Sequence, residues 1–247
     1  MKIQKILNLE QVNAESDTDG FLIDSSVKTH KSINGIIYRI VSGVPVGLSL
    51  VPPNINGTIY LPDTVLQLFD RALPYYAKAE RIIGQNVEQI HEHALISGNL
   101  HSVFFPKLQK IYPYAFANSG LIKFDIFSDI DIYPVAFEHC QLRQLSDHNQ
   151  LHKITIQTES FANCQALENI LLIHSEEVII QMGAFIGCSN LKSVTIRNIK
   201  SIPFHAFANC PTLENVFLPA GCQVDVDAFD DCVKSKVTFF KSINLSD

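Results

Sequence analysis

The sequence has no apolar run long enough to cross a membrane as a helix, which takes about 20 consecutive apolar residues. The start of the chain, MKIQKILNLEQVNAESDTD, has one short apolar run, and Gln4 and Lys5 interrupt it. A secretory signal needs an apolar stretch of roughly 7–15 residues and a small-residue cleavage site, and both are missing. We therefore expect a soluble protein without a membrane partner or classical signal peptide, either cytoplasmic or exported by a non-classical route.

Charge is also sparse. Only 18% of the 247 residues are charged, the formal net charge is −6, and no block of like charge stands out. Nucleic-acid binding normally shows as a basic patch or stripe, so we expect no nucleic-acid partner. The 47% hydrophobic content is ample for a folded core and unlike that of a disordered chain.

The common catalytic and cofactor motifs are absent as well. The sequence contains no G-x-S-x-G, no P-loop and no G-x-G-x-x-G. Paired zinc ligands at C-x₂₋₄-C spacing are also missing. We therefore expect a non-enzymatic protein with no catalytic residues, no metal site and no cofactor.

A sequence repeat extends over residues 90–240. Aligned on one bulky apolar position, the units contain Leu95, Phe116, Phe137, Phe161, Phe185, Phe207 and Phe229, which are 21 to 24 residues apart. The position five residues earlier is always aliphatic: Ile90, Ile111, Ile132, Ile156, Ile180, Ile202 and Val224. A small residue, alanine or Ser160, directly precedes each bulky position. A period of about 20–29 residues is typical of leucine-rich repeats, whose units stack into a solenoid.

Each slot of this repeat has a physical reason. Bulky side chains can stack from one coil to the next at the strand spacing of about 4.8 Å, provided that a small neighbour keeps the backbones close. The position two residues later holds mostly residue types that tolerate positive φ, such as Asn118, Asn163 and Asn209, which predicts the end of a short helical turn. The Leu-x-x-apolar segment that follows predicts a short strand.

Five cysteines occupy one slot of the repeat: Cys140, Cys164, Cys188, Cys210 and Cys232. A metal site and disulfides between neighbouring coils are the two functional interpretations. The spacing does not suit zinc, and stacked thiols would have parallel Cβ vectors, so we favour core packing. Cys222 lies outside the slot and is the thiol expected to be most exposed.

The residues before the repeat predict a cap. Residues 1–33 are polar and aperiodic, which predicts a flexible arm. Residues 36–60 read as two or three strands, and the segment from Asp63 to Gly84 has near-helical apolar spacing with Pro74 in its middle. We therefore predict a strand–helix cap over 34–89, a solenoid of about seven units over 90–240 that closes with a strand at 236–240, and a tail at 241–247.

His91-Glu92-His93 is the one tight group of potential metal ligands. On an extended strand both imidazoles would lie on the same face, so a metal site is conceivable. The matching positions of other units hold Pro113 with Tyr114 and Pro203 with Phe204, which supply no second pair of ligands. We favour a solvent-facing loop, and we keep a hydrolase or metal-binding protein using His91 and His93 as an alternative.

The solvent-facing positions of the strands form the candidate binding surface. By alternation, the outward side chains include Phe104, Lys123, Asp125, Gln144, Asn169, Leu171, Ser193, Thr195, Asn215 and Phe217. Most are polar, but Phe104, Leu171 and Phe217 are candidate interface anchors. The alternative is that the N-terminal arm or the cap covers these three residues.

Taken together, the pattern A-F-x-x-C with its flanking leucines resembles the BspA-like class of leucine-rich repeats. Residues 161–240 match best, as in FANCPTLENVFLPAG at 207–221. The first units depart from the pattern, since Leu95 replaces Phe and the polar run SDHNQ occupies 146–150.

The resemblance implies an α/β repeat solenoid that coils to the right, with a parallel sheet on its concave side and short helical turns on its convex side. A bacterial secreted effector or surface protein is compatible with this resemblance, and no motif in the sequence assigns a compartment. The resulting prediction is a protein–protein interaction module that binds an unidentified protein on the concave face. The alternative is a structural or self-associating protein that forms homo-oligomers.

Overall fold

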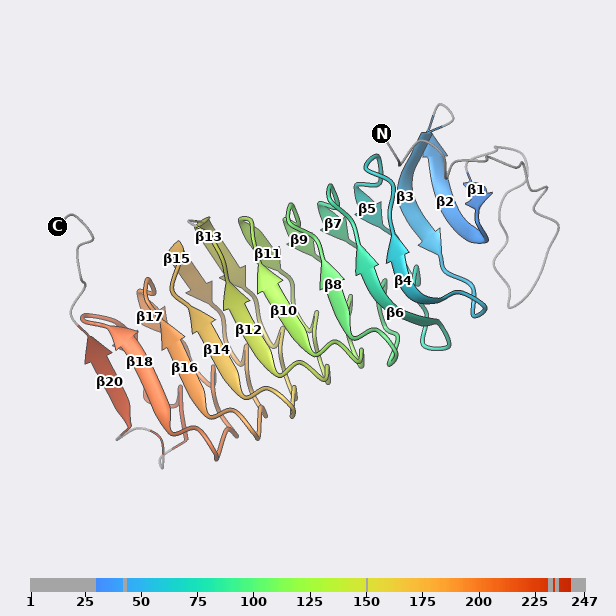
Figure 1. Ribbon diagram of the computed structural model, residues 1–247. Coiled ribbons are helices and arrows are strands. Elements are labelled where there is room, and N and C mark those ends of the chain that lie inside the picture. The colour runs from blue at the N-terminus through green and yellow to red at the C-terminus, as the bar shows by residue number, and fades with distance from the viewer. Residues whose placement is uncertain (1–29, 42–43, 150, 231–232, 234–235, 241–247) are drawn as a thin grey trace.

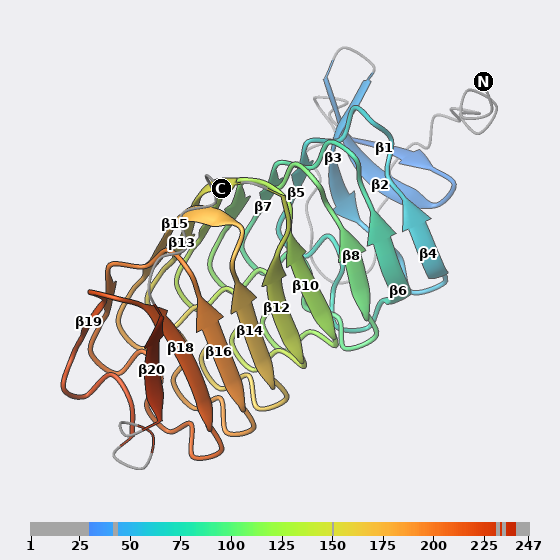
Figure 2. The same cartoon turned by 60° about the vertical axis from the view of Figure 1, so that its left-hand side comes forward.

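The computed structural model describes residues 30–41, 44–149, 151–230, 233 and 236–240. The chain winds into a solenoid of about eight turns, in which each coil adds one strand to each of two long rows. Figures 1 and 2 show the two rows running along the solenoid from the N-terminal hairpin to the C-terminal end. Neighbouring strands within each row are parallel, except in the N-terminal hairpin.

The first row contains the strands that carry the predicted outward residues. It begins with a three-stranded sheet and continues as a six-stranded sheet, and the amide of Ile122 donates to the carbonyl of His101 (3.1 Å) between them. Its strands are β4 (Asn56–Tyr60), β6 (Lys78–Ile83), β8 (Ser102–Phe104), β10 (Lys123–Ile126), β12 (Gln144–Asp147), β14 (Asn169–Leu172), β16 (Ser193–Ile196), β18 (Asn215–Pro219) and β20 (Val237–Phe240).

The second row begins with antiparallel strands and continues with shorter parallel ones. The antiparallel strands are β1 (His30–Ile33), β2 (Ile36–Val41) and β3 (Val44–Leu50), and β3 pairs in parallel with the first coil. The parallel strands are β5 (Gln67–Leu68), β7 (Gln89–Ile90), β9 (Lys110–Ile111), β11 (Ile130–Ile132), β13 (Leu151–Ile156), β15 (Ser175–Ile180), β17 (Ser201–Ile202) and β19 (Gln223–Val224).

A column of stacked phenylalanine rings runs through the core, as the repeat predicts. The rings of Phe116, Phe137 and Phe161 are stacked with centroids 4.7 and 4.6 Å apart. The stack continues through Phe185, Phe207 and Phe229 at 5.1–5.2 Å. These spacings are close to the strand spacing of about 4.8 Å, so each coil places its ring directly on the ring of the coil before it.

A ladder of backbone hydrogen bonds beside this stack shows why the preceding residue is small. The amide of Phe137 donates to Ser160 O (2.7 Å), that of Phe161 to Ala184 O (2.8 Å) and that of Phe185 to Ala206 O (2.9 Å). The small side chains in this slot are buried in every coil. A larger side chain here would force the coils apart and break the ladder.

Two positions of the coil adopt left-handed backbone conformations, and one of them was predicted. Positive φ occurs at Asn118, His139, Asn163, Gly187 and Asn209, two residues after the Phe slot. The second position, two residues before the Phe slot, was not predicted, and it holds Arg71, His93, Tyr114, Val135, Glu159, Gly183 and His205. A β-branched residue such as Val135 rarely adopts positive φ, so residue type could not reveal this turn.

The predicted helices are wrong. Within the described part of residues 30–230 there is no helix, and the connections between strands are turns and short loops. The segment from Asp63 to Gly84 instead contains β5 and β6 and forms the same kind of coil as later units. The fold is therefore an all-β solenoid, and it contains one coil more than the seven predicted units.

The N-terminal and C-terminal predictions are only partly described. Residues 30–33 of the predicted arm form β1, and the rest of the arm lies outside the described residues. The closing strand is present as β20, while the tail at 241–247 lies outside the described residues. The described residues include no helix with the length and apolar character needed to span a membrane.

Candidate functional site

The outward residues predicted from the sequence lie on one face of the first row. Register pairs join Lys123, Gln144, Asn169, Ser193 and Asn215 in one line. A second line runs from Asp125 through Ser146, Leu171 and Thr195 to Phe217. We call this surface the ladder face and define it by Phe104, Lys123, Asp125, Gln144, Asn169, Leu171, Ser193, Thr195, Asn215 and Phe217.

Alternation along each strand produces this face. On β14, Ile170 and Leu172 are buried in the core, whereas Asn169 and Leu171 are exposed. The exposed fractions of Phe104, Leu171 and Phe217 are 38%, 39% and 39%. The three predicted anchors are therefore accessible, and the described parts of the N-terminal segments do not cover them.

The N-terminal half of the ladder face carries a cluster of paired polar groups. Lys123 Nζ lies 3.0 Å from Asp125 Oδ2. Ser146 Oγ donates to Asp125 Oδ1 (2.7 Å), and His148 Nε2 lies 2.8 Å from the same oxygen. Burial alone would raise the pKa of Asp125, but hydrogen bonds from these three side chains outweigh it and hold the pKa below its ordinary value.

Serine, histidine and aspartate thus meet in this cluster, but not in a catalytic order. In a Ser–His–Asp triad the histidine accepts from the serine and donates to the aspartate. Here Ser146 and His148 both use Asp125 Oδ1, and no hydrogen bond joins them among the contacts of the described residues. The arrangement fixes the three side chains relative to one another, with Ser146 buried at 3% exposure, but does not activate the Ser146 hydroxyl.

Aromatic rings flank this cluster in a way that sequence analysis missed. Phe127 stacks on the His148 ring with centroids 5.1 Å apart, and it meets Phe104 edge to face at 5.5 Å. Phe127 and His148 directly follow β10 and β12, where outward alternation continues for one more residue. Extending the strand pattern by one outward position would have identified both.

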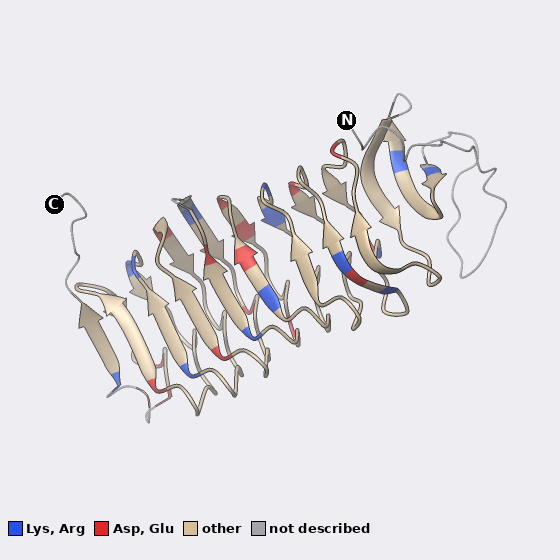
Figure 3. Ribbon diagram, in the orientation of Figure 1, with Lys and Arg blue, Asp and Glu red and all other residues tan. Residues whose placement is uncertain are grey.

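The C-terminal half of the ladder face has no charged side chain on its strands. Its outward residues on β14, β16 and β18 are Asn169, Leu171, Ser193, Thr195, Asn215 and Phe217. In the margin formed by the residues that precede the strands, the charged side chains alternate in sign: Arg143, Glu168, Lys192, Glu214 and Lys236 (Figure 3). Lys192 Nζ and Glu168 Oε2 are 2.8 Å apart, so these two side chains form an ion pair.

The second row carries a different feature, a ladder of aromatic rings that includes His91. The His91 ring lies between Phe69 and Tyr112, with centroids at 5.2 and 5.1 Å, and Tyr112 stacks on Tyr133 at 5.1 Å. Arg39 covers the free face of Phe69 at 5.2 Å from the ring centroid. The ring faces between Phe69 and Tyr133 are therefore occupied by one another.

The two histidines considered as potential metal ligands, His91 and His93, belong to separate stacks. His91 belongs to the aromatic ladder, and its Nε2 lies 3.2 Å from Gln67 Oε1. The His93 ring stacks on the Tyr114 ring with centroids 5.0 Å apart. Among the described residues, no group of three or more His, Cys, Asp or Glu side chains is arranged to hold a metal ion. The role that the geometry gives these imidazoles is packing between coils.

We expect His91 to make stability depend on pH. Burial is the main cause that lowers the pKa of His91, and Arg39 lowers it further while Glu92 opposes the shift. Unfolding therefore takes up a proton between the folded and unfolded pKa values, and the free energy of unfolding decreases as pH falls from about 7 towards 5. His91→Phe keeps a stacked ring and should lessen this decrease, as measured by urea unfolding. An identical pH dependence in both proteins would contradict the prediction.

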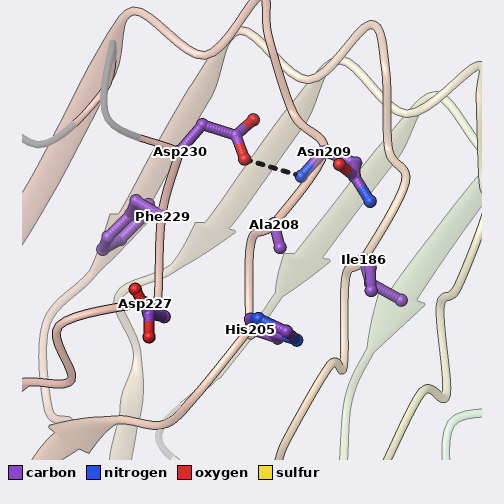
Figure 4. Close-up of a pocket in the computed structure, with 7 residues that line it drawn as sticks. All are labelled: Ile186, His205, Ala208, Asn209, Asp227, Phe229 and Asp230. Carbon is purple, nitrogen blue, oxygen red and sulfur yellow. Dashed lines mark hydrogen bonds between the residues drawn. The ribbon is translucent and has the colours of Figure 1, made fainter.

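A small cleft lies between the last two coils. It has a volume of about 330 Å³ and is lined by residues that include His205, Asn209, Asp227 and Asp230 (Figure 4). Asp230 Oδ1 accepts from the amide of Asn209 and Oδ2 from that of Cys210, both at 2.9 Å. In earlier coils the amide equivalent to Asn209 N donates to a backbone carbonyl of the next coil. Asp230 thus replaces that carbonyl where the array ends, and its carboxylate is already used.

The cysteine slot is part of the core in the described coils. Cys140, Cys164, Cys188 and Cys210 are free and fully buried, and the thiol of Cys164 donates to Phe137 O (3.0 Å). Burial raises the pKa of Cys140 to about 11 and that of Cys210 to about 12, so these thiols stay protonated at neutral pH. Core packing is confirmed for these four, and Cys232 lies outside the described residues. Cys222 is half-buried, which makes it the most accessible of the described cysteines.

Comparison with known proteins gives one family match. The family model of the BspA type leucine-rich repeat region matches residues 54–143 and 130–246 with six copies. The search of curated proteins found no similar sequence.

Three solved structures are similar at low identity. A leucine-rich repeat protein from Bacteroides ovatus is 16% identical over 79% of this chain and 71% of its own, with a TM-score of 0.36. A leucine-rich cell surface protein from Faecalibacterium prausnitzii is 16% identical over 84% of this chain and 79% of its own, with a TM-score of 0.32. The pneumococcal vaccine antigen PcpA is 12% identical over 88% of this chain and 99% of its own, with a TM-score of 0.29.

Proposed function

Because the chain belongs to the BspA-type leucine-rich repeat family, we propose that it is a non-enzymatic interaction module whose ladder face binds a protein partner. The observation that carries this proposal is the exposure of Phe104, Leu171 and Phe217 on one sheet surface. Exposed apolar side chains surrounded by polar ones are typical of protein interfaces, where a few apolar anchors supply most of the binding free energy.

The solenoid supports this role by fixing its outward side chains before a partner arrives. Each strand of the face is hydrogen-bonded to its neighbours, and the residues beneath it are stacked in the core. A rigid surface loses little conformational entropy when it binds, so more of the contact energy remains as affinity. Lys123, Asp125 and His148 satisfy one another, which leaves the apolar side chains as the main source of affinity.

The test replaces two of the anchors with aspartate. We expect Phe104→Asp/Phe217→Asp to weaken partner binding by about 100-fold or more, since each carboxylate would be desolvated in an apolar contact. Both side chains are more than one third exposed, so the fold should persist. The partner is first recovered by affinity capture with the whole chain as bait, and binding of the purified partner is then measured by calorimetry.

Phe204→Asp provides the matched control, because Phe204 is 40% exposed and lies outside the ladder face. Loss of binding in this control, or retained binding in the double variant, would contradict the assignment of the face. Recovery of this chain alone would instead favour the self-associating alternative. An observation that supports this alternative is Phe239 on the last strand, β20, which is 51% exposed although its register partner Leu218 is buried.

A further inference from the structure

The C-terminal half of the ladder face has a more specific composition than a general interface. We call it the neutral strip, formed by Asn169, Leu171, Ser193, Thr195, Asn215 and Phe217. Asn169, Ser193 and Asn215 are register partners in one line, and the other three residues form the next line. The strip thus offers one line of hydrogen-bonding groups beside one line that begins and ends in an apolar side chain.

The polar groups of the strip are not used by the protein itself. Among the contacts of the described residues, the side chains of Asn169, Ser193 and Asn215 have no hydrogen-bond partner. Asparagines in the turns behave differently: Asn190 Nδ2 donates to Gln165 O (2.7 Å), and Asn99 Nδ2 donates to Ala77 O (2.8 Å). The turn asparagines hold neighbouring coils together, whereas those of the strip leave their donors free for a ligand.

The strands of the strip offer no charged side chain to hold an acidic or basic ligand. The margin next to Asn169 and Asn215 alternates in sign, and its Lys192–Glu168 pair is closed at 2.8 Å. On the other side, Arg197 follows β16, is half-buried and is already engaged within the protein. On the strands of the strip a ligand therefore meets amides, hydroxyls and apolar groups, and charged side chains such as the exposed Glu214 lie at the margin.

The spacing of the strands indicates the conformation of the ligand. Adjacent strands are about 4.8 Å apart, so matching residues of β14 and β18, with β16 between them, are about 9.6 Å apart. A polyproline II helix rises about 3.1 Å per residue with three residues per turn, so residues i and i+3 point the same way about 9.3 Å apart. In an extended β-strand, residues i and i+3 point to opposite faces. Of these two extended conformations, polyproline II is the one that places a side chain over both Leu171 and Phe217.

We propose that the neutral strip binds an uncharged, proline-rich peptide in the polyproline II conformation, running across β14, β16 and β18. Apolar side chains at every third position pack on Leu171 and Phe217. Asn169, Ser193 and Asn215 donate to peptide carbonyls, which have no internal hydrogen bonds in this conformation. The inference rests on the proposed function and specifies the partner segment for one half of the ladder face.

The test uses the whole chain and a fluorescein-labelled peptide of four Leu-Pro-Pro repeats, measured by fluorescence anisotropy. We expect saturable binding that changes little between about 0.05 and 0.5 M NaCl, since no charge pair is involved. Asn169→Ala/Asn215→Ala removes two donors and should weaken binding about tenfold. Asn190→Ala is the matched control and should leave the affinity unchanged, because Asn190 lies in a turn and donates to Gln165 O.

A second peptide of the same composition tests the spacing. Its leucines are placed in adjacent pairs, which removes the three-residue period, and we expect it to bind at least about tenfold more weakly. Equal binding of the two peptides, or unchanged binding by the double variant, would overturn the proposal. So would binding of neutral oligosaccharides with no binding of the Leu-Pro-Pro peptide. If the peptide fails to bind while the captured partner still depends on Phe104 and Phe217, this inference is wrong and the proposed function stands.

Discussion

Replacing Phe161 with alanine is expected to lower the free energy of unfolding by about 3–5 kcal/mol, the usual cost of removing a buried aromatic side chain. The Phe161 ring is fully buried between Phe137 and Phe185, with centroids at 4.6 and 5.1 Å. Its loss leaves a cavity in the middle of the stack, and the backbone ladder on both sides limits collapse. Urea unfolding followed by circular dichroism measures the effect.

Two control variants separate stacking from the mere loss of a phenylalanine. Phe161→Leu should cost no more than about 1.5 kcal/mol, because leucine keeps most of the apolar volume and Leu73 and Leu95 occupy the equivalent slot in the first coils. Phe217→Ala removes an exposed ring and should cost less than about 1 kcal/mol. Similar losses for Phe161→Ala and Phe217→Ala would show that the stack does not hold the coils together.

The stack of phenylalanine rings could be predicted because the residues that form it occupy the same slot in successive repeat units. A slot that holds a bulky apolar residue after a small one in each of seven units has few explanations other than stacking, and the ring centroids confirm this one. The outward positions followed from the same register, since alternation along a parallel strand determines both faces at once. The features predicted correctly are therefore those that repeat.

The helix at 63–84 was predicted because one coil of the solenoid mimics helical spacing. Val65, Phe69 and Leu73 are separated by four residues, which suits a helix as well as a coil with frequent inward positions. In the structure Leu68 and Leu73 are buried inward, whereas Leu66 and Tyr76 are exposed. Leu73 lies five residues after Leu68 and directly follows the small Ala72, as in the later units, so this pair is the signal that would have identified the coil.

Contacts between coils were harder to predict, because they join residues that the repeat does not distinguish. The ladder through Phe69, His91, Tyr112 and Tyr133 holds a different ring in almost every coil, so its slot shows no single residue type.

The contact between coils made by Asp147 was even harder to predict. Asp147 lies within the polar run SDHNQ, where a solvent-facing loop is the simplest interpretation, yet its register partner is the core residue Ile126. Its role becomes visible only when residues 173–175 of the next coil are in place.

We expect Asp147→Asn to lower the free energy of unfolding by about 2–4 kcal/mol, since charge-assisted hydrogen bonds would be lost in a buried site. Asp147 is 2% exposed, and its carboxylate accepts from the amides of Ile173 (2.8 Å), His174 (3.0 Å) and Ser175 (2.8 Å) and from the Ser175 hydroxyl (2.6 Å). Asparagine keeps one acceptor oxygen and turns an amide group towards the remaining donors. Urea unfolding at neutral pH measures the difference.

Two further variants identify the cause. Asp125→Asn changes the same group on the adjacent strand, where the side chain is partly solvated, and should cost less than about 1 kcal/mol. Asp147→Leu restores an apolar side chain to an inward register line that also contains Ile126, but it leaves the amides of residues 173–175 without their acceptor. If the leucine variant were as stable as the original protein, apolar burial would be sufficient at this position. A loss as large as that of Asp147→Asn would show that the carboxylate holds the turn between β14 and β15, and with it the spacing of the coils beneath the neutral strip.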